Sequence, residues 1–343
     1  LTNLVKLFLA FNNLSSVPPT LQHCQKLAVL DLSHNLLENL PPGLKNLTEM
    51  GVVKLSANSL KKFPRQICCW TSLTHVYLRK TRLHTVPRSF TRLTSVRVLD
   101  LSENCFDEIP KGICSMKNLE VLALDGNQIQ EIPVKVKQLT NLKCISLSEN
   151  QFSIFPKEIF LLESLERLYL GQDKGIKFTS LPEDISKLQN LKELHVENNC
   201  LEYLPEAIGS LTYLKILDCH SNLLKKLPDS ICQIQGLQKL LLQNNCLSQL
   251  PEDLDHLQQL ELVLLDGNPM TDPPTEVCCQ GTSAIWEYLL DKRCKNARKL
   301  KIRSLWWGLI KKNLALKNQK KNRKNEKKGK EEGKKKPGKE AKK

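Results

Sequence analysis

Two pairs of histidine and carboxylate side chains have a spacing that could support chemistry. His195 and Asp218 are 23 residues apart, and so are Glu197 and His220. The chain repeats itself with this period, so each pair should lie side by side on adjacent strands of one sheet. Imidazole and carboxylate groups are ligands of zinc, which makes a metal site one hypothesis for the pairs. An enzyme that uses the same residues is a related hypothesis.

The residues around these pairs favour a surface that binds another protein. The sequence contains no His-Glu-x-x-His, Gly-x-Ser-x-Gly or Gly-x-x-x-x-Gly-Lys-Ser/Thr motif, so we expect no catalysis, no cofactor and no bound metal ion. Aromatic and arginine side chains are typical anchors of protein interfaces. Two groups on the strands are therefore expected to bind a protein: His75, Tyr77, Arg79 and Lys80, and then Arg167, Tyr169, Glu193, His195, Glu197, Asp218 and His220.

The whole of residues 1–275 is built from one recurring unit. Its pattern is Leu-x-x-Leu-x-Leu-x-x-Asn-x-Leu, followed by an apolar residue, a proline and a second apolar half. The spacing is 23 residues, except for 26 residues at an insertion around 174–176. The ninth position is occupied in turn by Asn12, Asn35, Asn58, Thr81, Asn104, Asn127, Asn150, Asp173, Asn199, Asn222, Asn245 and Asn268.

This pattern predicts an α/β solenoid of twelve repeats, curved like a horseshoe. The Leu-x-Leu pair should lie on a short strand with its leucines buried and the residues between them facing outward. One repeat cannot bury its apolar side alone, so successive strands should stack in parallel on the concave face. The asparagine should turn inward and bond backbone groups of its own turn and of the adjacent repeat. The apolar residues after the proline predict short helical or 3-10 turns on the convex face.

Residues 1–275 resemble the 23-residue class of intracellular leucine-rich repeats. The resemblance implies a non-enzymatic scaffold or adaptor in signal transduction that binds a protein partner on its concave face. A small GTPase or a phosphatase is the kind of partner that the class suggests, and no residue here identifies it. Residues 276–293 resemble the helix that caps the last repeat of such solenoids.

Residues 294–316 predict a basic amphipathic helix. Its apolar face has the spacing i, i+3, i+4, i+7 and i+8, which is filled by Ile302, Leu305, Trp306, Leu309 and Ile310. Lys301, Lys311 and Lys312 lie on the rest of the helix. Such a helix is typical of a calmodulin target or of a membrane-surface segment. In the alternative, the helix covers the C-terminal end of the solenoid.

The same segment is similar to an IQ motif, the helix that calmodulin-like EF-hand proteins bind. Ile302, Gly308 and Lys312 match the motif, whereas Arg303 replaces its glutamine and Trp307 its first arginine. Repeats and motif together resemble the leucine-rich repeat and IQ domain-containing proteins. The resemblance implies that a calmodulin-like partner would contact Ile302, Arg303, Leu305, Trp306, Trp307, Gly308, Leu309, Ile310 and Lys312.

The C-terminal end of the chain carries the positive charge. From Lys292 onward there are 23 Lys and Arg against 4 Asp and Glu, a net of +19, whereas the residues before it have a net charge of −4. Residues 317–343 contain almost no apolar side chains, so we expect a disordered tail. Association with nucleic acid or an anionic membrane through this basic segment is the alternative function.

The cysteines suggest the cellular location of the protein, and the first residue suggests that the repeats begin further upstream. Thirteen cysteines are spread through the repeats, which favours reduced thiols and a cytoplasmic protein, with a nuclear location as a variant through the basic tail. Leu1 falls inside a repeat, so we expect that further repeats or signals precede it in a longer chain.

Overall fold

Twelve short strands form one sheet in the computed structural model, which describes residues 2–332. The strands are β1 Lys6–Phe8, β2 Val29–Asp31, β3 Val52–Lys54, β4 His75–Tyr77, β5 Val98–Asp100, β6 Val121–Ala123, β7 Cys144–Ser146, β8 Arg167–Tyr169, β9 Glu193–His195, β10 Ile216–Asp218, β11 Lys239–Leu241 and β12 Leu262–Leu264. They are parallel and follow one another in sequence order. The central residue of each strand from β2 to β12 is buried, and the solenoid predicted from the repeat pattern is confirmed.

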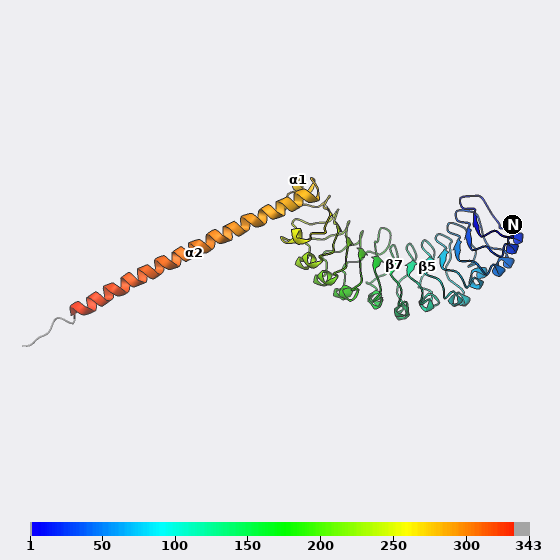
Figure 1. Cartoon of the computed structure of the whole chain (residues 1–343), viewed down its shortest axis with the longest axis horizontal. Helices are drawn as coiled ribbons and strands as arrows, with labels where there is room; N and C mark the ends of the chain where they lie inside the picture. Colours follow the sequence, from blue (N-terminus) through cyan, green and yellow to red (C-terminus); the bar gives the residue numbers. More distant parts are fainter. Residues whose placement is uncertain (1, 333–343) are drawn as a thin grey trace, which may run out of the picture. The chain divides into compact units, whose positions relative to one another are not determined.

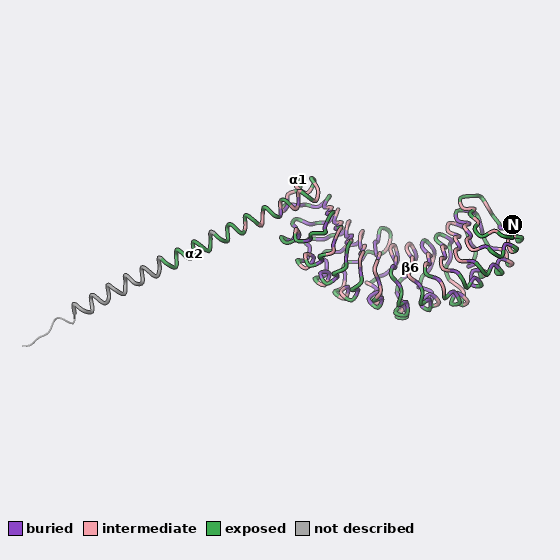
Figure 2. The backbone as a smooth tube through the Cα atoms, viewed as in Figure 1, coloured by how far each residue is buried: buried purple, intermediate pink, exposed green. Residues whose placement is uncertain are grey.

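Short 3-10 helices occupy the other half of most repeats, on the outer side of the arc that Figure 1 shows for the repeats. They are η1 Pro19–His23, η2 Pro42–Asn46, η3 Arg65–Cys69, η4 Arg88–Arg92, η5 Ile113–Ser115, η6 Val134–Gln138, η7 Lys157–Leu161, η8 Glu183–Lys187, η9 Glu206–Ser210, η10 Asp229–Gln233 and η11 Leu254–His256. A proline precedes most of them, and its fixed φ starts the turn without needing an N–H partner. The core lies between the two layers, as the buried residues in Figure 2 show.

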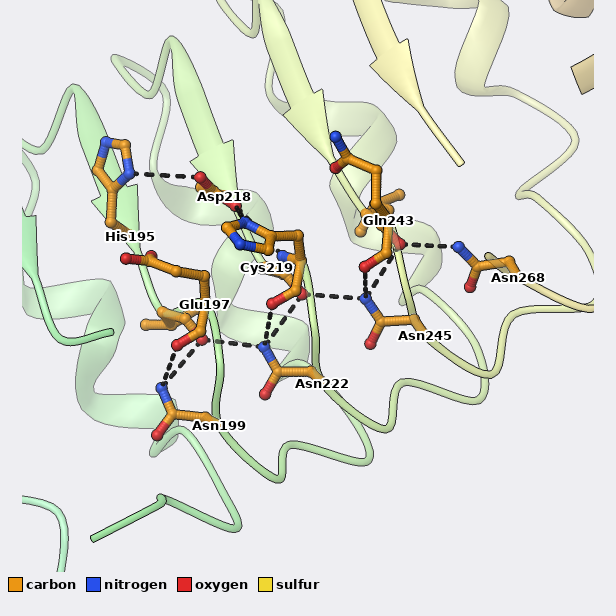
Figure 3. A network of polar contacts seen from close by, with 12 residues as sticks. His195, Glu197, Asn199, Asp218, Cys219, Asn222, Gln243, Asn245 and Asn268 are labelled. Carbon is orange, nitrogen blue, oxygen red and sulfur yellow. Dashed lines mark hydrogen bonds and ion pairs between the residues drawn. The ribbon is translucent and has the colours of Figure 1, made fainter. Parts of the chain in front are cut away.

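A ladder of buried asparagines ties each repeat to the one before it. Asn222 is 5% exposed, and its Nδ2 donates to the carbonyl oxygens of Val196 at 2.9 Å and Cys219 at 3.0 Å. Its Oδ1 accepts a hydrogen bond from the backbone N–H of Leu201 at 3.0 Å. Figure 3 shows this arrangement repeating at Asn199, Asn222, Asn245 and Asn268. The inward asparagine predicted from the sequence is confirmed.

The ladder changes at the three-residue insertion, and here one expectation was wrong. Asp173 was expected in the inward slot, but it is exposed, and Gln172 is buried there instead. The side-chain amide of Gln172 has no hydrogen-bond partner. A Cβ atom at Gly175 would lie 1.9 Å from Oε1 of Gln172 and 2.5 Å from the carbonyl oxygen of Asn150, so only glycine fits. The extra residues therefore turn the chain one position earlier than the repeat pattern predicts.

Two helices follow the last strand. Helix α1 spans Thr275–Cys278 and α2 spans Thr282–Glu332. The chain divides into two compact units, with residues 2–286 in the first and the rest of α2 in the second. In the first unit, Ile285 is fully buried and the hydroxyl oxygen of Thr282 accepts a hydrogen bond from the N–H of Val263 at 3.0 Å.

Helix α2 is longer than the helices expected from the sequence. It runs without a break across the boundary expected at residue 294 and through the first part of the expected tail, up to Glu332. Lysine and glutamate are good helix formers, which accounts for a helical backbone in a segment with almost no apolar side chains. Residues 333–343 of the expected tail lie outside the described residues. Among the described helices, none combines the length and the apolar character that a membrane span needs.

Replacement of one ladder asparagine should destabilise the solenoid strongly. Asn127 is 4% exposed, and its amide bonds the carbonyl oxygen of Leu101 at 3.0 Å and the N–H of Phe106 at 3.1 Å. Asn127→Ala leaves these buried groups without a partner, so the free energy of unfolding should fall by about 2–4 kcal/mol. Urea denaturation followed by circular dichroism measures the change.

The control is Asn141→Ala, because the exposed Asn141 donates only to the carbonyl oxygen of Lys117, at 2.8 Å. This variant should stay within about 0.5 kcal/mol of the wild type. Equal losses in the two variants would show that the ladder contributes no more than a surface hydrogen bond.

Candidate functional site

The residues predicted to bind a protein lie on two parts of the concave face. Strand β4 carries His75 and Tyr77, and the turn after it carries Arg79 and Lys80; we call these four the basic-aromatic group. Strands β8 to β10 and the turns after β9 and β10 carry Arg167, Tyr169, Glu193, His195, Glu197, Asp218 and His220. We call the last six of these the His195 cluster, and Arg167 lies beside it, in register with Glu193.

The sheet register brings the histidines and carboxylates of the cluster together. Tyr169 is in register with His195, and His195 with Asp218. Nδ1 of His195 lies 3.6 Å from Oδ2 of Asp218, and Nδ1 of His220 lies 2.7 Å from Oδ1 of the same carboxylate. Figure 3 shows His195 and Asp218 facing each other above Glu197. The predicted neighbourhood of His195 and Asp218 is therefore present.

Tyr169 and Glu193 complete the side of the cluster that lies toward β8. The rings of Tyr169 and His195 are stacked, with centroids 4.5 Å apart and an interplanar angle of 19°. The tyrosine hydroxyl donates to Oε2 of Glu193 at 3.1 Å. Burial, followed by the charge of Glu193, raises the pKa of Tyr169 to about 12. The phenol is therefore a hydrogen-bond donor at neutral pH and not a base.

The electrostatics of the cluster favour positive charge at its centre. Burial lowers the pKa of His195, but the bond to Asp218 and the negative charges of Glu197, Asp218 and Glu193 outweigh burial, so this pKa is raised. Burial raises the pKa of Asp218, but bonds from His195 and His220 outweigh it and hold the pKa below its ordinary value. For Glu197, burial is the main cause of a raised pKa. The cluster is thus short of positive charge.

Gly171 creates the space in which Glu197 lies. A Cβ atom at Gly171 would be 2.2 Å from Oε1 of Glu197, so any side chain at 171 would displace the carboxylate. The other oxygen of Glu197, Oε2, is buried without a hydrogen-bond partner. Gln243 in the next repeat but one also buries an unpaired Oε1. The sequence did not point to Gly171 or Gln243, because the space at Gly171 matters only through the direction of the Glu197 side chain, and the burial of Gln243 Oε1 depends on the direction of its own.

The ligand atoms of three cluster residues are close enough to hold one cation. One atom each from His195, Glu197 and Asp218 lie within 4.8 Å of one another. These residues form the only such group of three or more within the described part of the chain. The arrangement can bind a metal ion or a positively charged group of a partner, and it contains no nucleophile beside a base.

The basic-aromatic group is less basic than its sequence suggested. The rings of His75 and Tyr77 are stacked with centroids 6.4 Å apart, and the ammonium group of Lys54 lies 5.6 Å from the centroid of the Tyr77 ring. The guanidinium of Arg79 forms an ion pair with Glu103, with Nε 3.0 Å from Oε1. Glu103 was missed because it belongs to the turn of the next repeat. The surface here is a mixed aromatic and ionic patch.

Asp125 is a half-buried carboxylate of the concave face that no motif indicates. Its oxygens accept hydrogen bonds from the hydroxyl groups of Ser146 and Ser102, the latter at 3.3 Å, and from the N–H of Ser148 at 3.1 Å. Burial outweighs these bonds and raises the pKa of Asp125 above its ordinary value. Folding therefore makes the Asp125 carboxyl harder to ionise.

On helix α2, the described side chains of the predicted calmodulin-binding segment are exposed. The exposed fractions are 62% for Leu305, 66% for Trp306 and 64% for Trp307. Leu309 and Ile310 are 60% and 39% exposed, and Gly308 has no atom within 4 Å of its Cβ position. Arg303 and Lys312 are also exposed, and the side chain of Ile302 lies outside the described ones.

Comparison with known proteins settles the class of the repeats. The leucine-rich repeat region family matches residues 91–199, the family of two leucine-rich repeats matches 2–46 and the single leucine-rich repeat matches 190–211. A solved leucine-rich-repeat protein of Leptospira interrogans is 34% identical, with a TM-score of 0.74, over 80% of this chain and 69% of that one. The chain belongs to the leucine-rich-repeat family. These matches do not extend to the IQ-like segment, which stays a prediction.

More distant leucine-rich-repeat structures share the fold. The plant peptide hormone receptor RGFR1, solved in complex with RGF2, is 27% identical with a TM-score of 0.64, over 79% of this chain and 45% of the receptor. An internalin of Listeria monocytogenes is 20% identical with a TM-score of 0.65, over 80% of this chain and 84% of the internalin, and shows the fold alone. No curated protein matches the chain. Leucine-rich-repeat proteins are in general non-enzymatic modules whose concave surface binds other proteins.

Neutralising Asp125 should make the stability of this leucine-rich-repeat protein less sensitive to pH. Because its pKa is raised in the folded state, its stabilising contribution is present below the ordinary value of 3.8 and is lost as pH rises through the folded pKa. The melting temperature of Asp125→Asn should therefore gain on the wild type as pH rises from about 3 to 6. Thermal melts at each pH test this, with the exposed Asp107→Asn as control. A difference that is constant with pH would contradict the assignment.

Proposed function

We propose that this chain is an intracellular adaptor in signalling that binds a protein partner through its concave face. Support comes from the twelve-stranded sheet, which presents aromatic and ionic side chains of adjacent strands as one continuous surface. Tyrosine, histidine and arginine side chains supply large contact area together with hydrogen bonds. A small GTPase or a phosphatase is the partner class that the repeat class implies.

Concave-face tyrosines should decide which proteins the chain captures. We expect the double variant Tyr77→Ala and Tyr169→Ala to lose the specific partner that the wild-type chain retains from a cytoplasmic extract, because each loss of a buried aromatic anchor weakens binding by about 2 kcal/mol or more. Quantitative mass spectrometry of the retained proteins measures this loss.

The matched control is a second double variant that removes tyrosines outside the strands. Tyr203 and Tyr213 are 49% and 62% exposed and lie outside the sheet. Tyr203→Ala with Tyr213→Ala should leave the partner bound. If the concave-face variant still retained the partner, or if the control variant lost it, the binding surface would lie elsewhere.

We further propose that the segment 302–312 binds a calmodulin-like EF-hand protein, which would give the adaptor a second, regulated end. The supporting observation is the exposure of two adjacent tryptophans, Trp306 and Trp307, on a helix that also carries Arg303 and Lys312. Helices bound in a hydrophobic groove use such apolar anchors with basic neighbours. Nucleic-acid or anionic-membrane association of the basic segment is the alternative.

Titration of the full chain with calmodulin, with and without calcium, tests this proposal by calorimetry. We expect saturable binding, weakened about tenfold or more by Trp306→Ala. Leu300→Ala is the matched control, because Leu300 is as exposed as Trp306, at 66%, and lies about 120° around the helix from it at 100° per residue.

Two results would count against calmodulin binding. One is an absence of heat in both conditions, and the other is equal weakening by the two variants. Binding to RNA or anionic vesicles that falls steeply with salt and ignores both variants would favour the alternative function.

A further inference from the structure

We propose that His195, Glu197 and Asp218 bind a zinc ion on the concave surface. The inference is independent of which partner the adaptor recruits. It is carried by three donor atoms from two adjacent strands and a turn, all within 4.8 Å of one another. Zinc is bound by imidazole and carboxylate groups at about 2.0–2.2 Å, so the ligand atoms of a tetrahedral site lie about 3.3 Å apart. The observed 3.6 Å between Nδ1 of His195 and Oδ2 of Asp218 is close to this separation.

The backbone under the three residues is held in place, so the site would be built on a rigid base. His195 and Asp218 are the last residues of β9 and β10 and are paired in register. The adjacent core residues Leu194 and Leu217 are fully buried. Glu197 is followed closely by the ladder residue Asn199, which donates to the carbonyl oxygen of Glu197 at 3.1 Å. Only small side-chain rotations are needed to bring the donors to an ion.

Neighbouring groups orient the donors as metal sites require. A histidine ligand usually offers its second ring N–H to a carboxylate, and Nε2 of His195 lies 3.8 Å from Oε2 of Glu193. The stacked ring of Tyr169 fixes the plane of the imidazole. Nδ1 of His220 holds the second oxygen of Asp218 at 2.7 Å, which leaves Oδ2 free for the ion.

The cluster also contains an atom that a cation would satisfy. Oε2 of Glu197 is buried without a hydrogen-bond partner. A buried polar atom of this kind destabilises a fold by about 1–3 kcal/mol, so it calls for an explanation in the ligand chemistry of the site. Three carboxylates, from Glu193, Glu197 and Asp218, lie around the imidazole of His195, and a divalent ion would offset their negative charge.

The chemistry of the three donor groups indicates which metal ion the site would bind. Calcium and magnesium prefer oxygen ligands alone, whereas one histidine with two carboxylates suits zinc. Three protein ligands leave the fourth position of a tetrahedral zinc ion open. On a concave binding face, that position is available to a water molecule or to a side chain of the bound protein. Zinc would then strengthen partner binding directly.

Zinc binding by the full chain is measured by stripping the purified protein with a chelator and titrating it with zinc in a calorimeter. We expect one equivalent to bind at micromolar or tighter dissociation constant. Asp218→Asn and Glu197→Gln should each lose this equivalent. Asp100→Asn is the matched control, because Asp100 ends β5 as Asp218 ends β10, and its Oδ1 likewise accepts a backbone N–H two residues later, at 3.0 Å. His84→Gln, at an exposed histidine, is the control for imidazole.

Thiols are the main competing ligands, since all thirteen cysteines are free. Cobalt(II) distinguishes the two cases, because tetrahedral coordination by nitrogen and oxygen gives visible bands without the thiolate charge-transfer absorption. We expect the bands without that absorption, and their loss in Asp218→Asn. A spectrum with thiolate absorption that Asp218→Asn leaves unchanged would overturn the proposal, as would equal zinc binding by the wild type and this variant.

Gly171→Ala provides a test that leaves all three donors in place. The added methyl group would push the carboxylate of Glu197 out of the cluster, so zinc affinity should fall about tenfold or more. Circular dichroism melts of the metal-free variants check that each still folds. Unchanged zinc affinity in a folded Gly171→Ala protein would show that Glu197 is not a ligand.

Discussion

Most repeats depend on one buried asparagine amide that bonds backbone groups of two consecutive repeats. Asn222 reaches the carbonyl oxygens of Val196, Cys219 and His220 and the N–H of Leu201, and thereby joins two consecutive repeats. A strand of three residues makes too few bonds to define its own register. The asparagine supplies the missing constraint, because it fits only when successive turns are aligned. This alignment accounts for the parallel sheet, for the burial of the leucines and for the outward orientation of the strand residues between them.

This constraint also decides which side chains can meet. Residues separated by one period are neighbours on the concave face, so His195 and Asp218 are brought together by repetition and not by a dedicated loop. A solenoid can therefore assemble a polar site by changing a few outward positions in two or three adjacent repeats, without disturbing the core. The insertion after β8 releases this constraint locally. There the inward slot passes from the expected Asp173 to Gln172, whose amide is unpaired.

The repeat made most of the fold predictable, and the exceptions have physical causes. Strand positions, register and the asparagine contacts follow from residue type at a fixed period, so they could be read from sequence. The site was predictable to the level of strands and neighbours. Contacts between side chains of different repeat positions were not: Glu103 pairs with Arg79 across a turn, and Glu197 fills the space above Gly171. The extension of α2 through residues 317–332 was also beyond the pattern, because this segment has almost no apolar side chains and therefore no apolar period to read.

The His195 cluster carries an electrostatic cost that exposed ion pairs do not. Exposed pairs such as Lys225 and Glu202, 2.6 Å apart, remain solvated, and their formation changes stability little. In the cluster, carboxylates are drawn out of water beside one another, and burial raises the pKa of Glu197. The stability of a solenoid is a sum over its repeats and the interfaces between them. Twelve repeats can therefore tolerate a loss of stability in two of them. A binding role of the kind proposed for this cluster would explain a loss of stability that the fold does not require.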